Sequence, residues 1–126
     1  MTGKVVHFEV PFDDGDRARA FYREVFGWNV MPMPGFDYTG VSTGPSGEDG
    51  MPNEPGYIGG GMFQRDPDVS TPVIVMAVDD IDATLAEVAA NGGSTAREKE
   101  AVGDMGHAAY FNDSEGNLMG LWQSAT

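Results

Sequence analysis

The chain has 126 residues, of which 40% are hydrophobic and 21% are charged, so its size and composition are those of one globular domain. Twenty acidic residues against seven basic ones give a formal charge of -13, which argues against nucleic acids and anionic membranes as partners. The absence of cysteine excludes disulfides, thiol catalysis and cysteine-ligated metals. The sequence shows no apolar run long enough to span a membrane and no signal-peptide core, and we expect a cytoplasmic protein.

The first half of the chain predicts a strand, a helix and further strands. Residues 5–12 are β-branched and aromatic, which is typical of a strand. The aspartates of residues 13–16 supply N-cap chemistry, and apolar residues at helical spacing then predict a helix that ends at Gly27. Further strands are predicted over residues 38–43 and 57–64, with a weaker candidate over residues 28–33.

The same order of elements returns in the second half. Residues 73–78 predict a strand, and Asp79 and Asp80 cap a helix that ends at Gly92. Two more strands are predicted over residues 107–111 and 118–123, joined by a turn at residues 113–117.

The two halves align as an internal repeat. Residues 7–14 correspond to residues 73–80, a strand followed by two aspartates in both cases. The last strand of each half carries the pattern Gly-apolar-aromatic-Gln, at residues 61–64 and 120–123. The sequence therefore predicts two modules of the same construction.

The first half also carries an additional loop, residues 44–56. Its many Gly and Pro residues forbid regular structure and predict a surface loop. The loop is either an insertion without consequence or a lid over a pocket, with Met51 as its apolar tip.

Several motifs resemble the vicinal oxygen chelate superfamily, which includes glyoxalase I, extradiol dioxygenases and the fosfomycin and bleomycin resistance proteins. The most specific of them is Ala-x-x-Phe-Tyr-x-x-Val-Phe-Gly-Trp, which runs from Ala18 to Trp28. The resemblance covers nearly the whole chain. The other segments that carry it are residues 6–10, 59–62, 78–83 and 113–123.

The resemblance implies an α+β fold in which two βαβββ modules form a cupped mixed β-sheet with the helices outside. It implies a single glyoxalase-like domain over residues 1–126, made of modules at about 4–65 and 72–124. It also implies a homodimer, in which the modules pair within one chain or between chains.

Metal-dependent members of the superfamily place His, Gln or a carboxylate at up to four positions inside the cup, on the first and last strand of each module. By motif, these positions are His7, Gly61, Val73 and Gly120 in this chain. His7 alone has a donor side chain, and one imidazole cannot hold a divalent ion against water. The comparison with the superfamily therefore predicts a site without a metal ion and without another cofactor.

His7 and Glu9 are the candidate catalytic residues. They lie two positions apart on the first strand and therefore share one face of it. His7 is either an inert polar residue of the cup wall or a substrate-orienting donor or general base, and Glu9 is expected to favour its protonated form. One divalent ion held by these two residues and His107 is the alternative to a metal-free site.

Alternation along the strands predicts the side chains that line the cup. The missing side chains at Gly61 and Gly120 are expected to leave free volume at its centre. Aromatic walls and few polar groups suit an apolar or aromatic ligand. The predicted ligand-binding residues are His7, Glu9, Phe63, Val73, Val75 and Trp122.

Three functions remain open at this point. The favoured one is a metal-free, glyoxalase/bleomycin-resistance-like protein that binds a small apolar or aromatic molecule, and the acidic chain would attract a cationic one. The second is a divalent-metal-dependent glyoxalase-like lyase or isomerase, or a dioxygenase. The third is a metal-free acid/base enzyme that uses His7 and Glu9. The sequence alone does not decide whether the chain is an enzyme.

Overall fold

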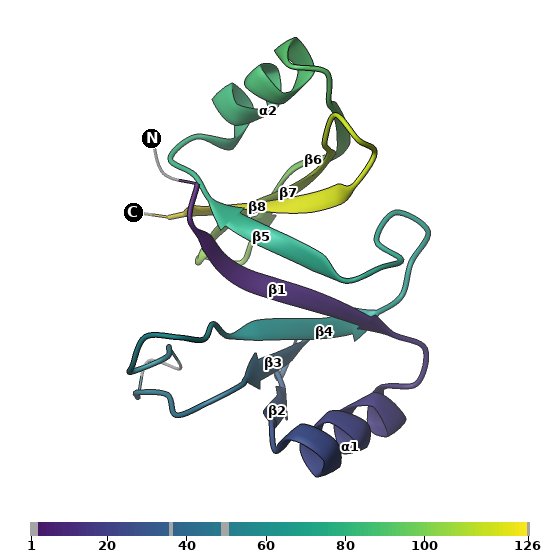
Figure 1. Cartoon of the computed structure of the whole chain (residues 1–126), viewed down its shortest axis with the longest axis vertical. Coiled ribbons are helices and arrows are strands. Elements are labelled where there is room, and N and C mark those ends of the chain that lie inside the picture. Colours follow the sequence, from purple (N-terminus) through teal and green to yellow (C-terminus); the bar gives the residue numbers. More distant parts are fainter. Residues whose placement is uncertain (1–2, 36, 49–50, 126) are drawn as a thin grey trace. The chain divides into compact units, whose positions relative to one another are not determined.

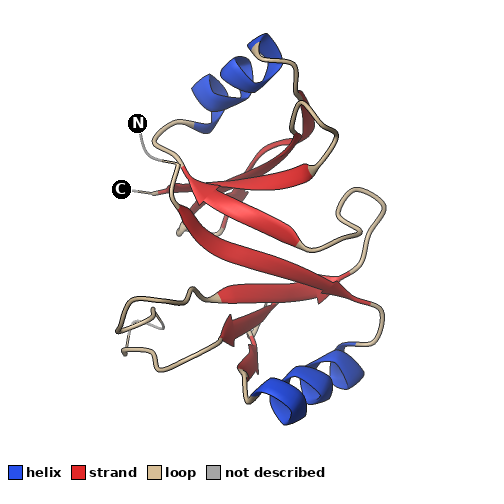
Figure 2. Ribbon diagram, viewed as in Figure 1, coloured by secondary structure: helices blue, strands red, loops and turns tan. Residues whose placement is uncertain are grey.

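The computed structural model describes residues 3–35, 37–48 and 51–125. The chain has an α+β fold, and the order βαβββ occurs twice in it (Figures 1 and 2). None of the described helices is long and apolar enough to cross a membrane. The elements are β1 (Val5–Phe12), α1 (Gly15–Phe26), β2 (Asn29–Pro32), β3 (Thr39–Ser42), β4 (Gly60–Gln64), β5 (Val73–Ala77), α2 (Ile81–Ala90), β6 (Ser94–Val102), β7 (Gly106–Asn112) and β8 (Leu118–Ser124).

The described chain divides into two compact units. One, the 7–72 unit, contains residues 7–72; the other, the 73–125 unit, contains residues 73–125 together with residues 3–6. Residues 3–6 contact the 73–125 unit, in which the backbone amide of Ala77 donates to the carbonyl of Lys4 at 2.9 Å.

In the 7–72 unit the strands follow the order β2-β3-β4-β1, with β4 and β1 parallel and the other pairs antiparallel. Helix α1 begins where the Asp14 side chain accepts from the backbone amide of Arg17 at 3.0 Å, an N-cap of the expected kind. It ends at Gly27, whose φ of 70° is the left-handed conformation that glycine adopts at low cost.

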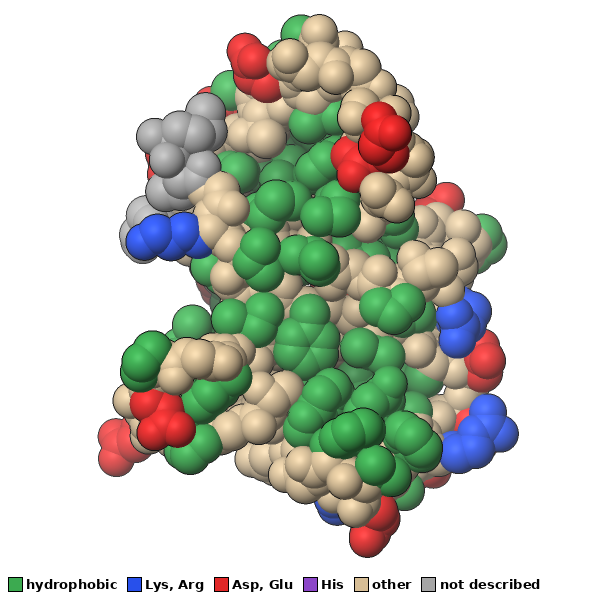
Figure 3. Space-filling view, viewed as in Figure 1, with side chains coloured by type: hydrophobic (Ala, Val, Ile, Leu, Met, Phe, Trp, Pro, Cys, Tyr) green, Lys and Arg blue, Asp and Glu red, His purple; other side chains and the backbone are tan. Residues whose placement is uncertain are grey.

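Helix α1 covers one face of its own sheet. Val30, Val41 and Met62 form the buried centre of this packing. The ring of Tyr22 stacks on that of Trp28 with centroids 4.6 Å apart. The outer side of α1 exposes Phe21, and Figure 3 shows hydrophobic side chains gathered over this helix. Other hydrophobic residues that pack against the centre are Phe8, Val10, Phe12 and Ala18.

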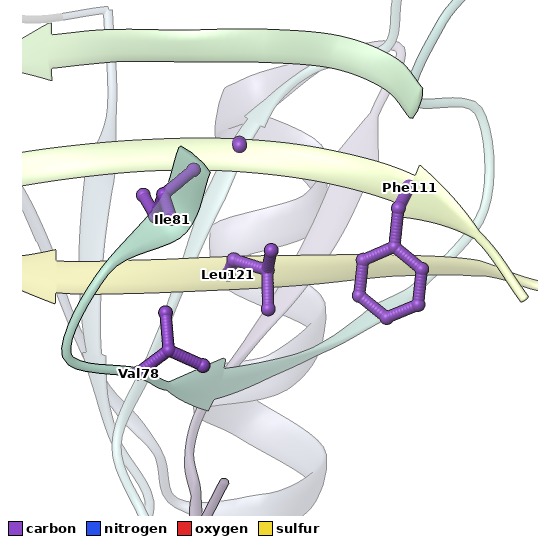
Figure 4. Packing of buried hydrophobic residues seen from close by; sticks show 5 residues of the cluster. Val78, Ile81, Phe111 and Leu121 are labelled. Atoms are coloured by element: carbon purple, nitrogen blue, oxygen red, sulfur yellow. The ribbon is translucent and has the colours of Figure 1, made fainter. Parts of the chain in front are cut away.

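The 73–125 unit repeats this arrangement with the strand order β5-β8-β7-β6. Asp80 caps α2 by accepting from the amide of Ala83 at 3.1 Å. Ile81 and Leu121 are almost fully buried, which contributes about 1.5–3 kcal/mol for each side chain (Figure 4). The remaining buried members of this core are Val78, Ala109 and Phe111.

Strand β6 is the element that the sequence pattern misses. Four of its nine residues are charged, and most of its side chains are exposed. It lies at the edge of its sheet, where charged residues protect the unpaired strand and no apolar alternation is required. The residue pattern therefore shows none of the signals that mark a half-buried strand.

The predicted strand 57–64 is shorter in the structure and begins at Gly60. Tyr57 instead packs against the 44–56 loop, because its ring lies against Gly44 and its hydroxyl donates to the carbonyl of Pro45. Ser46 and Pro52 also form a bridge within this loop. The exposed Met51 lies next to two residues that are outside the described part, and the lid hypothesis stays a prediction.

Candidate functional site

His7 and Glu9 lie on the face of the 7–72 sheet that is turned away from α1. Phe8 and Val10 pack into the core against α1, so the alternating residues between and beside them face the other way. On this second face, Glu9 of β1 is paired with Gly61 of β4. The prediction that His7 and Glu9 share a face with Gly61 agrees with the structure.

Tyr38 connects the two polar residues. Its hydroxyl oxygen lies 2.7 Å from Nε2 of His7, and the hydroxyl donates to Oε2 of Glu9 at 3.2 Å. Because the phenol donates its one proton to Glu9, its oxygen accepts from Nε2–H of His7. With Tyr38 as donor to Glu9, the tautomer of the neutral imidazole that satisfies both hydrogen bonds has its proton on Nε2 and its lone pair on Nδ1.

His7 is held in its neutral form. Burial lowers the pKa of its imidazole below the ordinary value of 6.5, because removal from water disfavours the charged ring. The expected effect of Glu9, which would favour the protonated form, does not set the net direction of the pKa. Desolvation is the dominant effect, and the Tyr38 hydroxyl stands between the carboxylate and the imidazole.

Gly61 is the residue that makes room for Tyr38. A Cβ atom built on Gly61 would overlap the hydroxyl oxygen and Cζ of Tyr38. The phenol therefore passes over the bare backbone of β4 to reach His7 and Glu9 on β1. The expected free volume at Gly61 is not present, because Tyr38 fills it.

The ring of Tyr38, whose hydroxyl donates to the buried Glu9 carboxylate, lies nearly parallel to two other rings. The ring of Tyr38 is 6.4 Å from that of Phe63, with an angle of 4° between the planes. It is also 6.4 Å from the imidazole of His7, at an angle of 13°. Glu9 is 9% exposed, whereas the three rings are half-buried. The face thus presents aromatic surface with a small number of polar atoms.

A second set of contacts fixes the start of β3. Thr39, the residue after Tyr38, is 1% exposed and accepts from the guanidinium of Arg19 at 3.2 Å. Arg19 comes from α1, where it also bonds Asp16 at 2.7 Å. Its guanidinium lies over the ring of Phe12, 5.9 Å from the centroid. Helix α1 therefore holds the backbone that carries Tyr38.

In the 73–125 unit the corresponding face is apolar. Val73 and Val75 are buried, and a Cβ built on Gly120 would lie 3.3 Å from the first and 3.0 Å from the second. Tyr110 lies 3.6 Å from the same point. The volume expected at Gly120 is thus mostly taken up. Trp122 has the same parity on β8 and is half-buried.

His107 does not lie on this face. It has the same parity on β7 as Ala109 and Phe111, which pack into the core beneath α2. Its Nδ1 is buried and has no hydrogen-bond partner among the described residues. Alternation therefore turns His107 away from the face of its own sheet that carries Val73 and Val75.

Two aromatic residues of these faces carry no local signal of their role. The residue pattern predicts only that Tyr38 begins a strand and that Tyr110 lies within one. Both owe their positions to pairing between strands: Gly40 with Gly61, and Tyr110 with Gly120. The guanidinium of Arg97 lies 5.6 Å from the centroid of the Tyr110 ring.

A surface hollow of about 480 Å³ lies apart from the predicted residues, between α2 and β6. The ion pair between Lys99 Nζ and Asp82 Oδ2, 2.7 Å long, crosses it. Both partners are substantially exposed, and such pairs contribute little to stability. The residues that line the hollow are Asp82, Leu85, Ala86, Thr95, Glu98 and Lys99.

The residues present do not fit the metal ion of the metal-dependent superfamily members. Within residues 3–35, 37–48 and 51–125, no group of three or more His, Asp or Glu side chains is placed to hold an ion. The Nε2 atom of His7 is hydrogen-bonded to the hydroxyl of Tyr38. The side-chain position at Gly61 is filled by the same phenol.

Comparison with known proteins identifies the family. Residues 4–44 match the family "Bleomycin resistance protein-like N-terminal". A "Probable lactoylglutathione lyase" of Vibrio parahaemolyticus is 30% identical over 128 residues, which cover 98% of this chain and 92% of the relative. The chain belongs to the vicinal oxygen chelate superfamily, in its glyoxalase/bleomycin-resistance-like part.

Two further similarities concern a longer relative and a solved structure. The "Putative glyoxylase CFP32" of Mycobacterium bovis is 30% identical over 118 residues, 88% of this chain, and the chain spans only 42% of its length. A structure of Streptomyces coelicolor methylmalonyl-CoA epimerase in complex with 2-nitronate-propionyl-CoA has a TM-score of 0.64 and 18% identity, with full coverage of both chains. At this identity the similarity shows the fold alone.

Proposed function

We propose that the chain is a metal-independent, small-molecule-binding member of the superfamily. In the 7–72 unit, the ligand would lie against the face formed by His7, Glu9, Tyr38 and Phe63. The observation that carries the proposal is the hydrogen-bonded chain from His7 through Tyr38 to Glu9, which occupies a corner where a metal-dependent member has ligands. In the 73–125 unit, Val73, Val75 and Trp122 are the proposed ligand-contacting residues.

The chemistry of this face favours a flat apolar or aromatic ligand. The parallel rings of Tyr38 and Phe63 offer a surface for stacking, and Glu9 adds an acceptor beside it. A carboxylate at this place and a chain charge of -13 both disfavour anionic ligands. Neutral and cationic aromatic molecules are therefore the class proposed.

A thermal-shift screen tests this proposal. We expect a neutral or cationic aromatic compound to raise Tm by several degrees, since a ligand at 100 times its Kd stabilises by about 2.7 kcal/mol. Phe63→Ala should reduce the shift, whereas Phe21→Ala, on the outer side of α1, should leave it unchanged. A full shift in Phe63→Ala, or no shift from any compound of a broad panel, would contradict the proposal.

A metal-free acid/base reaction is the second candidate. It is favoured by the neutral His7 imidazole, whose Nδ1 lone pair can accept a proton while Tyr38 and Glu9 hold Nε2–H. The names of two relatives, a glyoxylase and a lactoylglutathione lyase, support an enzyme. The metal-dependent lyase, isomerase or dioxygenase would need donors that the described residues of the 7–72 unit do not supply.

Turnover in the presence of a chelator separates the two candidates. S-lactoylglutathione is the first compound to test, because one relative is named after it. Activity that survives EDTA and is lost in His7→Ala supports the acid/base enzyme. Binding without turnover, which His7→Ala only weakens, supports the binding protein.

We propose in addition that the protein is a cytoplasmic homodimer. The exposed Phe21, Val25 and Phe26 on α1, more than half accessible in each case, support self-association because such residues are costly to leave in water. Light scattering coupled to size exclusion distinguishes a dimer from a monomer. Phe26→Ser is expected to shift the equilibrium toward the monomer.

A further inference from the structure

We propose that Tyr38 is the residue that excludes a metal ion from this corner, by filling the place of a chelating side chain at position 61 and by occupying Nε2 of His7. The inference rests on the proposed metal-independent function, because it gives the physical reason for that independence. It assigns Tyr38 a specificity-determining role.

The first argument is steric. Any side chain at position 61 would begin where the Tyr38 hydroxyl lies. A Glu or Gln at that position and Tyr38 in its present place are therefore mutually exclusive. Arg19 donates to the hydroxyl of Thr39, the residue after Tyr38, and this contact favours rotation of the Tyr38 side chain over movement of the backbone.

The second argument concerns the imidazole. A metal ion needs the lone pair of the nitrogen that it binds, and the hydrogen bonds place a proton on Nε2. Binding at this atom would require the proton to move to Nδ1 and the Tyr38 hydroxyl to leave. Glu9 would lose the same hydroxyl as its donor.

The third argument is that the neighbouring donors are otherwise well placed. His7 and Glu9 share a face of β1, about 6.8 Å apart along the strand for two residues. Glu9 is paired with position 61 on the parallel strand β4. A carboxylate at position 61 would therefore give three nitrogen and oxygen donors on two adjacent strands, a set that suits a divalent ion.

A nickel titration of four proteins tests the inference. The double variant Tyr38→Ala/Gly61→Glu should bind Ni²⁺ about 10–100-fold more tightly than the wild type, the range by which groups around a ligand alter metal affinity. Adding His7→Ala to the double variant should remove the gain. Equal Ni²⁺ affinity in the double variant and the wild type would overturn the inference.

Tyr38→Phe keeps the ring and removes only the hydroxyl, so of these variants it should disturb the fold least. Broadening of the His7 ring signals by Ni²⁺ should begin at a lower Ni²⁺ concentration in this variant than in the wild type. Identical broadening in the two proteins would contradict the role of the hydroxyl.

The same titration separates failure of this inference from failure of the proposed function. Stoichiometric and tight Ni²⁺ binding at His7 in the wild type itself would overturn metal independence as a whole. Weak binding in the wild type with no gain in the variants would overturn the role of Tyr38 alone.

Discussion

The two units repeat one chain order, βαβββ, yet the space beside the equivalent glycines, Gly61 and Gly120, is filled in different ways. At Gly61 a tyrosine crosses the bare strand and connects a histidine with a carboxylate. At Gly120 the side chains of Val73 and Val75 pack against the backbone. Both units thus share one backbone plan, while the side chains at equivalent positions place a histidine and a carboxylate beside Gly61 and two valines beside Gly120. Chemistry is expected of the first face, and apolar contact of the second.

The largest expected effects test whether the two cores are equivalent. Met62 and Ile81 are both 0% exposed, one in each unit. Met62→Ala and Ile81→Ala should each lower the free energy of unfolding by about 2–5 kcal/mol, because each leaves a cavity. Urea unfolding followed by circular dichroism measures both. A loss below 1 kcal/mol in one variant would show that its unit is loosely packed and would break the comparison.

A smaller effect distinguishes the two glycines. Gly61→Ala displaces Tyr38 and removes its hydroxyl from the Glu9 carboxylate, at a cost of about 1–3 kcal/mol. Gly120→Ala requires Val75 to move by only a few tenths of an ångström and should cost less. In a Tyr38→Ala background, the cost of Gly61→Ala should largely disappear. Equal costs for the two glycines, or no coupling to Tyr38, would contradict the description of this corner.

The smallest expected effect is a pH dependence that belongs to the 7–72 unit. The pKa of His7 is lowered in the folded state, so below about pH 6.5 the unfolded chain binds more protons than the folded one. Stability should therefore fall as the pH decreases through 6.5, until the folded-state pKa is reached. Urea midpoints between pH 7.5 and 5.5 measure this fall. The decrease of the urea midpoint over this pH range should be smaller in His7→Gln than in the wild type. An equal decrease in the two proteins would contradict the burial of His7.

The local elements could be predicted from the sequence because their signals are local. Asp14 and Gly27 mark the ends of α1 through a cap and a left-handed residue, and Asp80 does the same for the start of α2. Strand β6 could not be found in the same way, since an exposed edge strand needs no apolar alternation.

The candidate site was predictable only in part. Alternation correctly placed His7 and Glu9 on the face turned away from α1. The role of Tyr38 depends on the register of β3 against β4 and on the empty side-chain position at Gly61, which are long-range properties. The lowered pKa of His7 follows from burial by the assembled unit, and no spacing along the chain reports it.

Nitrogen NMR of the His7 side chain tests the central claim most directly. The hydrogen-bonded chain predicts a neutral imidazole at pH 7.5 with a proton on Nε2, a bare Nδ1 and an Nε2 shift that changes in Tyr38→Phe. The same signals should not respond to one equivalent of Ni²⁺ in the wild type. A His7 ring with its proton on Nδ1, and an Nε2 that binds the metal, would contradict the account.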